Sequence, residues 1–432
     1  LNTGTRCFEQ RLQLIENTRT IPYRRRLPGR TKMTSSADYK NLESKYYMQV
    51  VNRMPPVLIR GEGTRVFDND GNNYLDFTAG WAVLNLGHSH PAVTEAIRDQ
   101  AGKILQMSNL FYTTPQLPLA KIIVDNSDID RVFFCNSGAE ANEGACKVAR
   151  KWGKIKLNGA YEIITTLDSF HGRTQAMMAA TGQPHYQDNW RPLMPGFVNV
   201  PYNNVQAIKD AYTEGKTCAV LLEPVQGEGG VNVPSDNYLK EVMDFCHDKN
   251  ILFMLDEVQT GMGRLGTLFG YQQFPGVEPD VMTLAKALGS GAPLGAFTTK
   301  QFCSVLEPGD HGSTFGGNAL TTAAGAAAAK VIVDEGIPRL ATETGAYFQG
   351  KLMALAEKHS FIEEVRGMGL LIAIQMTQDI AAATVTAALP EGLLINAVRP
   401  NMVRFMPPLN VTRDEVDEAV AILDKVFANT SN

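Results

Sequence analysis

Short apolar segments alternate along this chain with longer segments of helical periodicity, and this alternation limits the folds open to it. The apolar segments read as strands and are Val132–Cys135, Glu162–Thr165, Ala219–Leu222, Ile251–Leu255 and Val281–Leu284. Helix-like segments such as Ala139–Trp152 and Asn237–Lys249 lie between them. The pattern predicts an α/β sheet with helices on its faces.

The two flanks of this region have a different pattern. Val57–Phe77 alternates apolar and polar residues around glycines, which predicts short strands joined by turns. The alanine-rich segment Ala319–Asp334 is expected to begin a long helix that leaves the large domain. The segments after it are the strand-like Arg366–Gln375 and Met402–Met406 and an amphipathic terminal helix, Arg413–Ala428. We therefore predict a large domain at 79–329 and a small domain at 330–432, with 36–78 as the N-terminal segment of the small domain.

Two apolar segments are each followed by carboxylates at the start of a glycine-rich loop. Glu223 opens the loop Glu223–Gly230, and Asp256 and Glu257 open a second loop that ends at Gly261. Ligands of open α/β sheets bind beyond the carboxyl ends of the strands, so these acids are candidate site residues. Taken one at a time, each could equally be a solvated loop residue.

Lys286 follows a third apolar segment and is itself followed by small residues, up to Gly291. A lysine in such a position can be desolvated, which lowers its pKa and frees the amine to form a Schiff base. A lysine that ends a strand is otherwise most often a solvated edge residue.

Asn136–Asn142 lies between a strand-like and a helix-like segment. The backbone N–H groups of Gly138 and Ala139 would then be free at a helix N-terminus, where donors and dipole favour a phosphate. An ordinary turn between strand and helix is the alternative.

These features occur together with further motifs that cover nearly everything from about Pro56 to the C-terminus. The motifs are Leu86–Pro91, Asn136–Asn142, Ser169–Thr174, Glu223–Gly230, Asp256–Gln259, Lys286, His311–Asn318 and Arg404–Pro408. In this order and spacing they closely resemble the class III aminotransferases of fold type I, and within them the acetylornithine/ornithine aminotransferase branch. The resemblance implies a large domain with a mostly parallel central sheet and a smaller α+β domain.

The resemblance also implies pyridoxal 5'-phosphate (PLP) as the cofactor. Lys286 would bind it covalently and later move the substrate proton, while Asp256 would pair with the pyridine nitrogen. The other cofactor contacts that it implies are Gly138, Ala139, Phe170, Glu257, Val258, Gln259 and Thr314. Thr314 and Ser313 would reach the active site of a neighbouring subunit, so the resemblance implies a homodimer.

Substrate choice is implied in the same way. Arg173 resembles the arginine that binds the remote carboxylate of the substrate, and Arg404 the one that binds the carboxylate beside the reacting carbon. Glu228 resembles the acid that neutralises Arg404 when an ω-amine is bound, and Ser313 would lie near the substrate. One departure is Leu105–Asn109, which lacks the histidine often present before Ser-Asn in the family.

The implied reaction transfers the distal amino group of N-acetylornithine to 2-oxoglutarate and gives N-acetylglutamate semialdehyde and glutamate, a step of arginine biosynthesis. Ornithine, succinylornithine, succinyldiaminopimelate or another ω-amino acid remain alternative donors. A non-catalytic binding protein of the same fold is an alternative of a different class.

A second different-class alternative is an NAD-dependent dehydrogenase, because Gly261–Gly266 matches the dinucleotide fingerprint. The following residues, Thr267–Tyr271, do not open a helix, which argues against it. His88 and His90 have no further ligands of metal-site spacing, so no metal is predicted.

Charge and cysteine content set limits on partners and compartment. The formal net charge of -5 gives no basic surface for nucleic acid, and the apolar segments are too short to span a membrane. The six cysteines are sparse and indicate reduced thiols in a cytoplasmic protein. Residues 1–32 are rich in arginine, which permits a mitochondrial transit peptide, although Met33 is the favoured native start. We therefore expect residues 1–35 to be a disordered or non-native extension.

Overall fold

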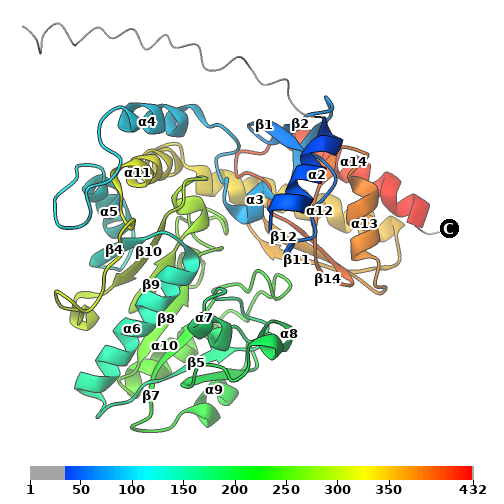
Figure 1. The fold of residues 1–432 in the computed structure, drawn as a ribbon. Helices are drawn as coiled ribbons and strands as arrows, with labels where there is room; N and C mark the ends of the chain where they lie inside the picture. Colours follow the sequence, from blue (N-terminus) through cyan, green and yellow to red (C-terminus); the bar gives the residue numbers. More distant parts are fainter. Residues whose placement is uncertain (1–34, 431–432) are drawn as a thin grey trace, which may run out of the picture. The chain divides into compact units, whose positions relative to one another are not determined.

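The computed structural model describes residues 35–430 (Figure 1). These residues divide into two compact units. The prediction for the N-terminal extension concerns residues that, apart from Ser35, lie outside this range. The smaller unit contains the described residues up to Leu58 together with Asp68–Gly71. Its helix α2 (Ser36–Tyr46) begins with a capping box, in which the hydroxyl of Ser35 accepts a hydrogen bond from the Asp38 N–H.

The larger unit contains a seven-stranded sheet in the order β4-β10-β9-β8-β7-β5-β6. Its strands are β4 (Arg131–Cys135), β5 (Glu162–Thr166), β6 (Phe197–Val200), β7 (Thr217–Leu222), β8 (Leu252–Asp256), β9 (Val281–Leu284) and β10 (Gly295–Thr299). The pairs from β6 through β5, β7 and β8 to β9 are parallel, whereas β10 is antiparallel to both β9 and β4. The prediction of a mostly parallel sheet is therefore confirmed.

The central strands are buried along their whole length and mostly apolar, because helices cover the sheet. Every residue of β7, β8 and β9 is buried, as expected for parallel strands with both faces covered. The helix α6 (Gly138–Lys156) packs on β7, β9 and β10 and crosses the sheet in Figure 1. The other helices of this region are α4 (Pro91–Ala101), α5 (Gln116–Asp125), α7 (Gln175–Ala180), α8 (Pro184–Gln187), α9 (Val205–Ala211) and α10 (Tyr238–Asp248).

A second, antiparallel sheet forms from the C-terminal part of the chain, in the order β11-β12-β15-β14. Its strands are β11 (Ile362–Met368), β12 (Leu371–Met376), β14 (Asn396–Arg399) and β15 (Met402–Phe405). The single strand-like segment predicted at Arg366–Gln375 is in fact a hairpin. Gly369 makes its turn with φ 57°, and a Cβ there would lie 2.5 Å from the backbone oxygen of Arg264.

Helices α12 (Ile337–Lys358), α13 (Ala381–Ala388) and α14 (Arg413–Thr430) pack against this sheet or one another, and α11 (Ala319–Asp334) begins at the predicted residue. A third sheet, in the order β1-β2-β3-β13, contains β1 (Leu58–Glu62), β2 (Arg65–Asp68), β3 (Asn73–Asp76) and β13 (Leu393–Leu394). Strand β13 pairs in parallel with β3, so the N-terminal strands join C-terminal ones. This pairing supports the predicted small domain, whose boundaries remain a proposal.

Among the described residues, no helix combines the length and the apolar character needed to cross a membrane.

Two helix glycines with different surroundings test how tightly α6 is packed. A Cβ on Gly153 of α6 would lie 2.0 Å from the backbone oxygen of Ala160, whereas one on Gly350 of α12 would meet nothing within 4 Å. We expect Gly153→Ala to destabilise the protein by about 1–3 kcal/mol through overpacking. The control Gly350→Ala should stabilise it by about 0.5–1 kcal/mol through helix propensity. Denaturant unfolding measures both, and equal effects would contradict the tight packing of α6.

Candidate active site

A cavity of about 410 Å³ lies at the carboxyl ends of the sheet strands. Its walls are formed mainly by residues at or just after the last position of each neighbouring strand. Those that carry polar or charged groups are Asn136, Ser137 and Asn142 after β4, His171 and Arg173 after β5, Glu223 and Glu228 after β7, Asp256 and Gln259 at the end of β8, and Lys286 after β9. The sheet topology therefore brings together residues up to 150 positions apart, as is general for open α/β folds.

Lys286 is the basic group at the centre of this arrangement. Burial lowers its pKa, and the nearby Arg404 acts in the same direction, while the carboxylates of Glu228 and Asp256 oppose the shift. Its backbone has φ 46°, an unfavourable region for a residue with a side chain. Strain of this kind persists where the surrounding fold imposes it, which is common at functional sites.

Asp256 is buried and bound on both carboxylate oxygens. Its Oδ2 accepts a hydrogen bond from Asn142 Nδ2 at 2.7 Å and lies 2.8 Å from His171 Nδ1. Its Oδ1 accepts one from the Val258 N–H at 3.0 Å. The carboxylate is thus fixed in one orientation at the cavity wall.

The N-terminus of α6 forms another wall. Ser137 caps the helix by accepting a hydrogen bond from the Glu140 N–H, and the residues Gly138 and Ala139 line the cavity. The N–H groups of a first helical turn have no acceptor within the helix. A Cβ on Gly138 would lie 2.9 Å from Val258 Cγ1, so only glycine keeps the backbone open here.

Arg404 forms a fully buried cationic group at the cavity edge. Its Nη1 donates to Glu228 Oε1 at 2.9 Å and to Gln259 Oε1 at 3.1 Å. Burial alone would raise the pKa of Glu228, but Arg404 and Lys286 outweigh it and lower that pKa to about 2. Glu228 therefore stays ionised and neutralises the arginine. The buried Nη2 of Arg404 has no hydrogen-bond partner within residues 35–430.

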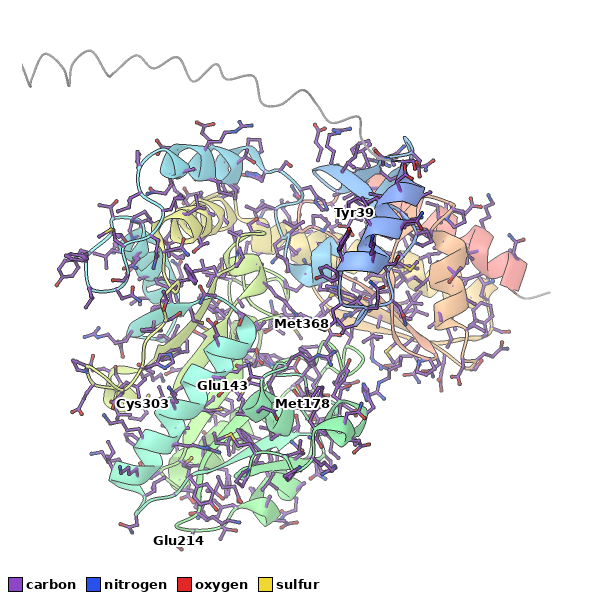
Figure 2. The ribbon with its side chains drawn as sticks, viewed as in Figure 1. Tyr39, Glu143, Met178, Glu214, Cys303 and Met368 are labelled. Carbon is purple, nitrogen blue, oxygen red and sulfur yellow. The ribbon has the colours of Figure 1, made fainter. Side chains whose placement is uncertain are left out.

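Arg173 is more exposed, and its guanidinium lies 4.0 Å from the ring centroid of Tyr186 and 5.4 Å from that of Phe170. The segment that carries it is tied to α6, because the Thr174 hydroxyl donates to Glu143 at 2.6 Å. Figure 2 labels Glu143 on α6 and Met178 on α7, the helix that follows this segment. Arg173 is thereby held at the entrance of the cavity.

Four predicted site residues do not line the cavity. One is Arg404, which donates hydrogen bonds to the lining residues Glu228 and Gln259. Glu257 follows Asp256 but turns away, and its carboxylate accepts hydrogen bonds from the N–H groups of Gly270 and Tyr271. A cofactor contact by Glu257 does not fit this geometry, because neighbouring side chains of a strand end point in opposite directions. Ser313 and Thr314 lie on a loop outside the cavity, where Ser313 Oγ accepts from Asn136 Nδ2 at 3.1 Å and Thr314 is exposed.

The roles of Asn142 and His171 were not predicted, whereas Glu223 was a candidate site residue. Asn142 and His171 hold Asp256, and Glu223 accepts hydrogen bonds from the N–H groups of Phe170 and Gly227, both at 3.0 Å. Burial raises the pKa of Glu223 to about 7, and the carboxylate of Asp256 acts in the same direction, although the two N–H donors oppose the shift. The sequence signal for Glu223 was its place after a strand. His171 and Asn142 stood inside recognised motifs, but nothing in their spacing indicated contact with Asp256.

Residues 46–427 match the family model described as Aminotransferase class-III. The chain belongs to this family. It is 49% identical to an acetylornithine aminotransferase of Caldanaerobacter subterraneus over 89% of this chain and 98% of that relative. A second acetylornithine aminotransferase, from Methanocaldococcus jannaschii, is also 49% identical, over 91% of this chain and 98% of that relative. Both the predicted family and its branch are confirmed.

A solved structure of a Toxoplasma gondii ornithine aminotransferase resembles this class-III aminotransferase with a TM-score of 0.88 and 34% identity, over 93% of this chain and 96% of that chain. The predicted fold class is thereby confirmed. The segment Gly261–Gly266, which matched a dinucleotide fingerprint, forms turns and bends rather than the start of a helix.

Substituting the buried lysine should stabilise the cofactor-free protein of this class-III aminotransferase. The pKa of Lys286 in the folded protein lies below that of free lysine, so the unfolded chain binds the proton more tightly. The lysine therefore lowers the free energy of unfolding by a larger amount as the pH falls. We expect Lys286→Met to raise the thermal midpoint, and by more at about pH 7 than at about pH 10. Lys154→Met, at an exposed position of α6, is the control and should show no such pH dependence. Parallel curves for both variants would contradict a lowered pKa.

Proposed function

We propose that this chain is a PLP-dependent aminotransferase that transfers the distal amino group of N-acetylornithine to 2-oxoglutarate, giving N-acetylglutamate semialdehyde and glutamate. One observation carries the proposal. Lys286, Asp256 and Glu228 line a single cavity, and Glu228 forms an ion pair with the buried Arg404. Together these groups can hold an aldehyde cofactor, move a proton and bind a substrate carboxylate.

The residues present fit PLP. The N-terminus of α6 with Gly138 and Ala139 would hold the phosphate, because the N–H groups of a first helical turn have no acceptor within the helix and a Cβ on Gly138 would meet Val258. Asp256 lines the same cavity and would pair with the pyridine nitrogen. Phe170, Val258 and Gln259 line the same cavity and would contact the ring and its phenolic oxygen. When bound, PLP supplies the aldehyde that accepts the amino group and a ring that withdraws electrons from the reacting carbon.

Lys286 would hold the cofactor and act as the base and acid at the substrate carbon. Its lowered pKa keeps a larger share of the amine neutral at physiological pH than in a free lysine, and only the neutral amine is a nucleophile or a base. Glu228 and Asp256 lie close enough to favour the ammonium form once the amine has taken up a proton. The residue is therefore able to accept a proton and return it.

The Arg404–Glu228 pair would let one site accept two kinds of substrate. The distal amine of N-acetylornithine has no adjacent carboxylate, so Glu228 would remain on Arg404 and avoid an unpaired buried charge. 2-Oxoglutarate has a carboxylate beside its reacting carbon, which would take the place of Glu228 and use the free Nη2 of Arg404. Arg173, at the cavity entrance, would bind the remote carboxylate of either substrate.

The identity of the donor rests on the relatives. The two relatives described above are acetylornithine aminotransferases, which supports N-acetylornithine. The Toxoplasma structure is an ornithine aminotransferase, which supports ornithine as the second candidate. We further propose a cytoplasmic homodimer, in which Ser313 and Thr314 serve the neighbouring site, since both lie outside the cavity of their own chain.

The visible absorption spectrum of purified protein tests this function. We expect a yellow protein whose band is bleached fastest by N-acetylornithine, compared with ornithine and 4-aminobutyrate, and returns on addition of 2-oxoglutarate. Faster bleaching by ornithine would replace the donor and keep the reaction. A colourless protein that PLP cannot reconstitute would refute the proposal.

Two substitutions separate the roles of the ion pair. Glu228→Gln removes the charge that neutralises Arg404, so kcat/KM for N-acetylornithine should fall at least about tenfold, with a smaller effect on 2-oxoglutarate. Arg404→Met should instead lower kcat/KM for 2-oxoglutarate by at least about a hundredfold, because the carboxylate loses its partner. Single-turnover measurement of each half-reaction gives both values. The same loss for both substrates in Glu228→Gln would show that the pair is merely structural.

A further inference from the structure

Asp256 depends on a buried histidine that comes from a different strand end. His171 is fully enclosed, and its Nδ1 lies 2.8 Å from Asp256 Oδ2. The backbone of His171 is fixed on both sides. Its N–H donates to Thr181 Oγ1 at 2.9 Å, and its carbonyl oxygen accepts from Asn142 Nδ2 at 2.8 Å. The imidazole therefore has little freedom to move away from the carboxylate.

Asn142 completes the same network. Its Nδ2 also donates to Asp256 Oδ2 at 2.7 Å, and its Oδ1 accepts a hydrogen bond from the Thr283 hydroxyl at 2.7 Å. Two donors thus bind Oδ2, whereas within the described residues Oδ1 accepts from the Val258 N–H alone. Asp256 lines the cavity, and Oδ1 keeps the larger capacity to accept a further hydrogen bond.

The second ring nitrogen decides the protonation state of His171. Its Nε2 is buried and has no hydrogen-bond partner in the described part of the chain. A charged imidazolium would bury an unpaired N–H there, which is costly, whereas a neutral ring leaves only an unpaired acceptor. This favours the form of His171 with its proton on Nδ1, which donates a hydrogen bond to Asp256.

We propose that His171, as a neutral Nδ1–H donor, is a positioning residue that holds Asp256 ionised and oriented toward the pyridine nitrogen of the cofactor. This inference rests on the proposed function, because it assigns PLP to the cavity. Its consequence is that cofactor affinity and the charge on the ring depend on a residue that does not itself need to touch the ring nitrogen.

The test compares His171→Ala, His171→Asn and His171→Gln. An asparagine amide can replace the Nδ1–H, whereas a glutamine amide falls near the Nε2 position and misses Asp256. His359→Ala is the matched control, because His359 is also buried and its Nε2 lies 2.8 Å from the carboxylate of Asp424, yet it does not line the cavity. Each variant is prepared without cofactor and titrated with PLP, and the absorption band of the loaded protein is followed against pH.

We expect His171→Ala and His171→Gln to raise the Kd for PLP at least about tenfold, since a hydrogen bond to a charged group is lost. The pH at which the absorption band of the loaded protein changes should be higher. A ring with less positive charge would withdraw less electron density from the nitrogen that joins Lys286 to the cofactor. His171→Asn should keep both the Kd for PLP and the pH midpoint close to those of the unaltered protein. His359→Ala should lower the thermal midpoint only.

An unchanged Kd and an unchanged pH midpoint in His171→Ala, with a thermal loss like that of His359→Ala, would overturn the inference. If His171→Ala does not fold, the contrast between the asparagine and glutamine variants gives the same decision. Failure of the unaltered protein to bind PLP would refute the proposed function instead, so the two outcomes are distinguishable.

Discussion

The parallel pairing of β7, β8 and β9 is the constraint on which the candidate site depends. Parallel strands in register end at the same edge of a sheet, so Glu223, Asp256 and Lys286 arrive side by side although long helical connections separate them in sequence. The strands can pair in this way because every one of their residues is buried and apolar side chains cover both faces. The charged groups of the site lie at or just beyond the ends of these strands.

Charge balance is the second requirement of this site, because several ionisable groups share a cavity of about 410 Å³. Arg404 is fully buried and would be costly if unpaired, and Glu228 is buried enough to resist ionisation if alone. Placed 2.9 Å apart, they stabilise each other's charged form. Among the described residues no ion pair is formed by Lys286, and burial lowers its pKa. The cavity thus contains an amine that can lose its proton, and a permanent cation lies next to it, paired with Glu228.

The environment of Asp256 shows the same principle for hydrogen bonds. A carboxylate in a buried position requires donors, and Asn142, His171 and the Val258 N–H provide them from three separate segments. These donors satisfy the acid within the protein and also restrict its orientation. The orphaned Nε2 of His171 is the one unpaired atom in this network, and it is what makes the neutral tautomer the favoured one.

The sequence by itself determined the α/β class, the mostly parallel sheet and the positions of most strands, because hydrophobic periodicity is a local property. It also indicated Lys286, Asp256, Gly138 and the Arg404–Glu228 pair, through their places after strands and through family motifs. The tertiary structure decided what depends on direction and on distant contacts. It turned Glu257 away from the cavity, split Arg366–Gln375 into a hairpin at Gly369, and placed His171 and Asn142 against Asp256. None of these can be read from spacing, because each follows from how separate chain segments pack in three dimensions.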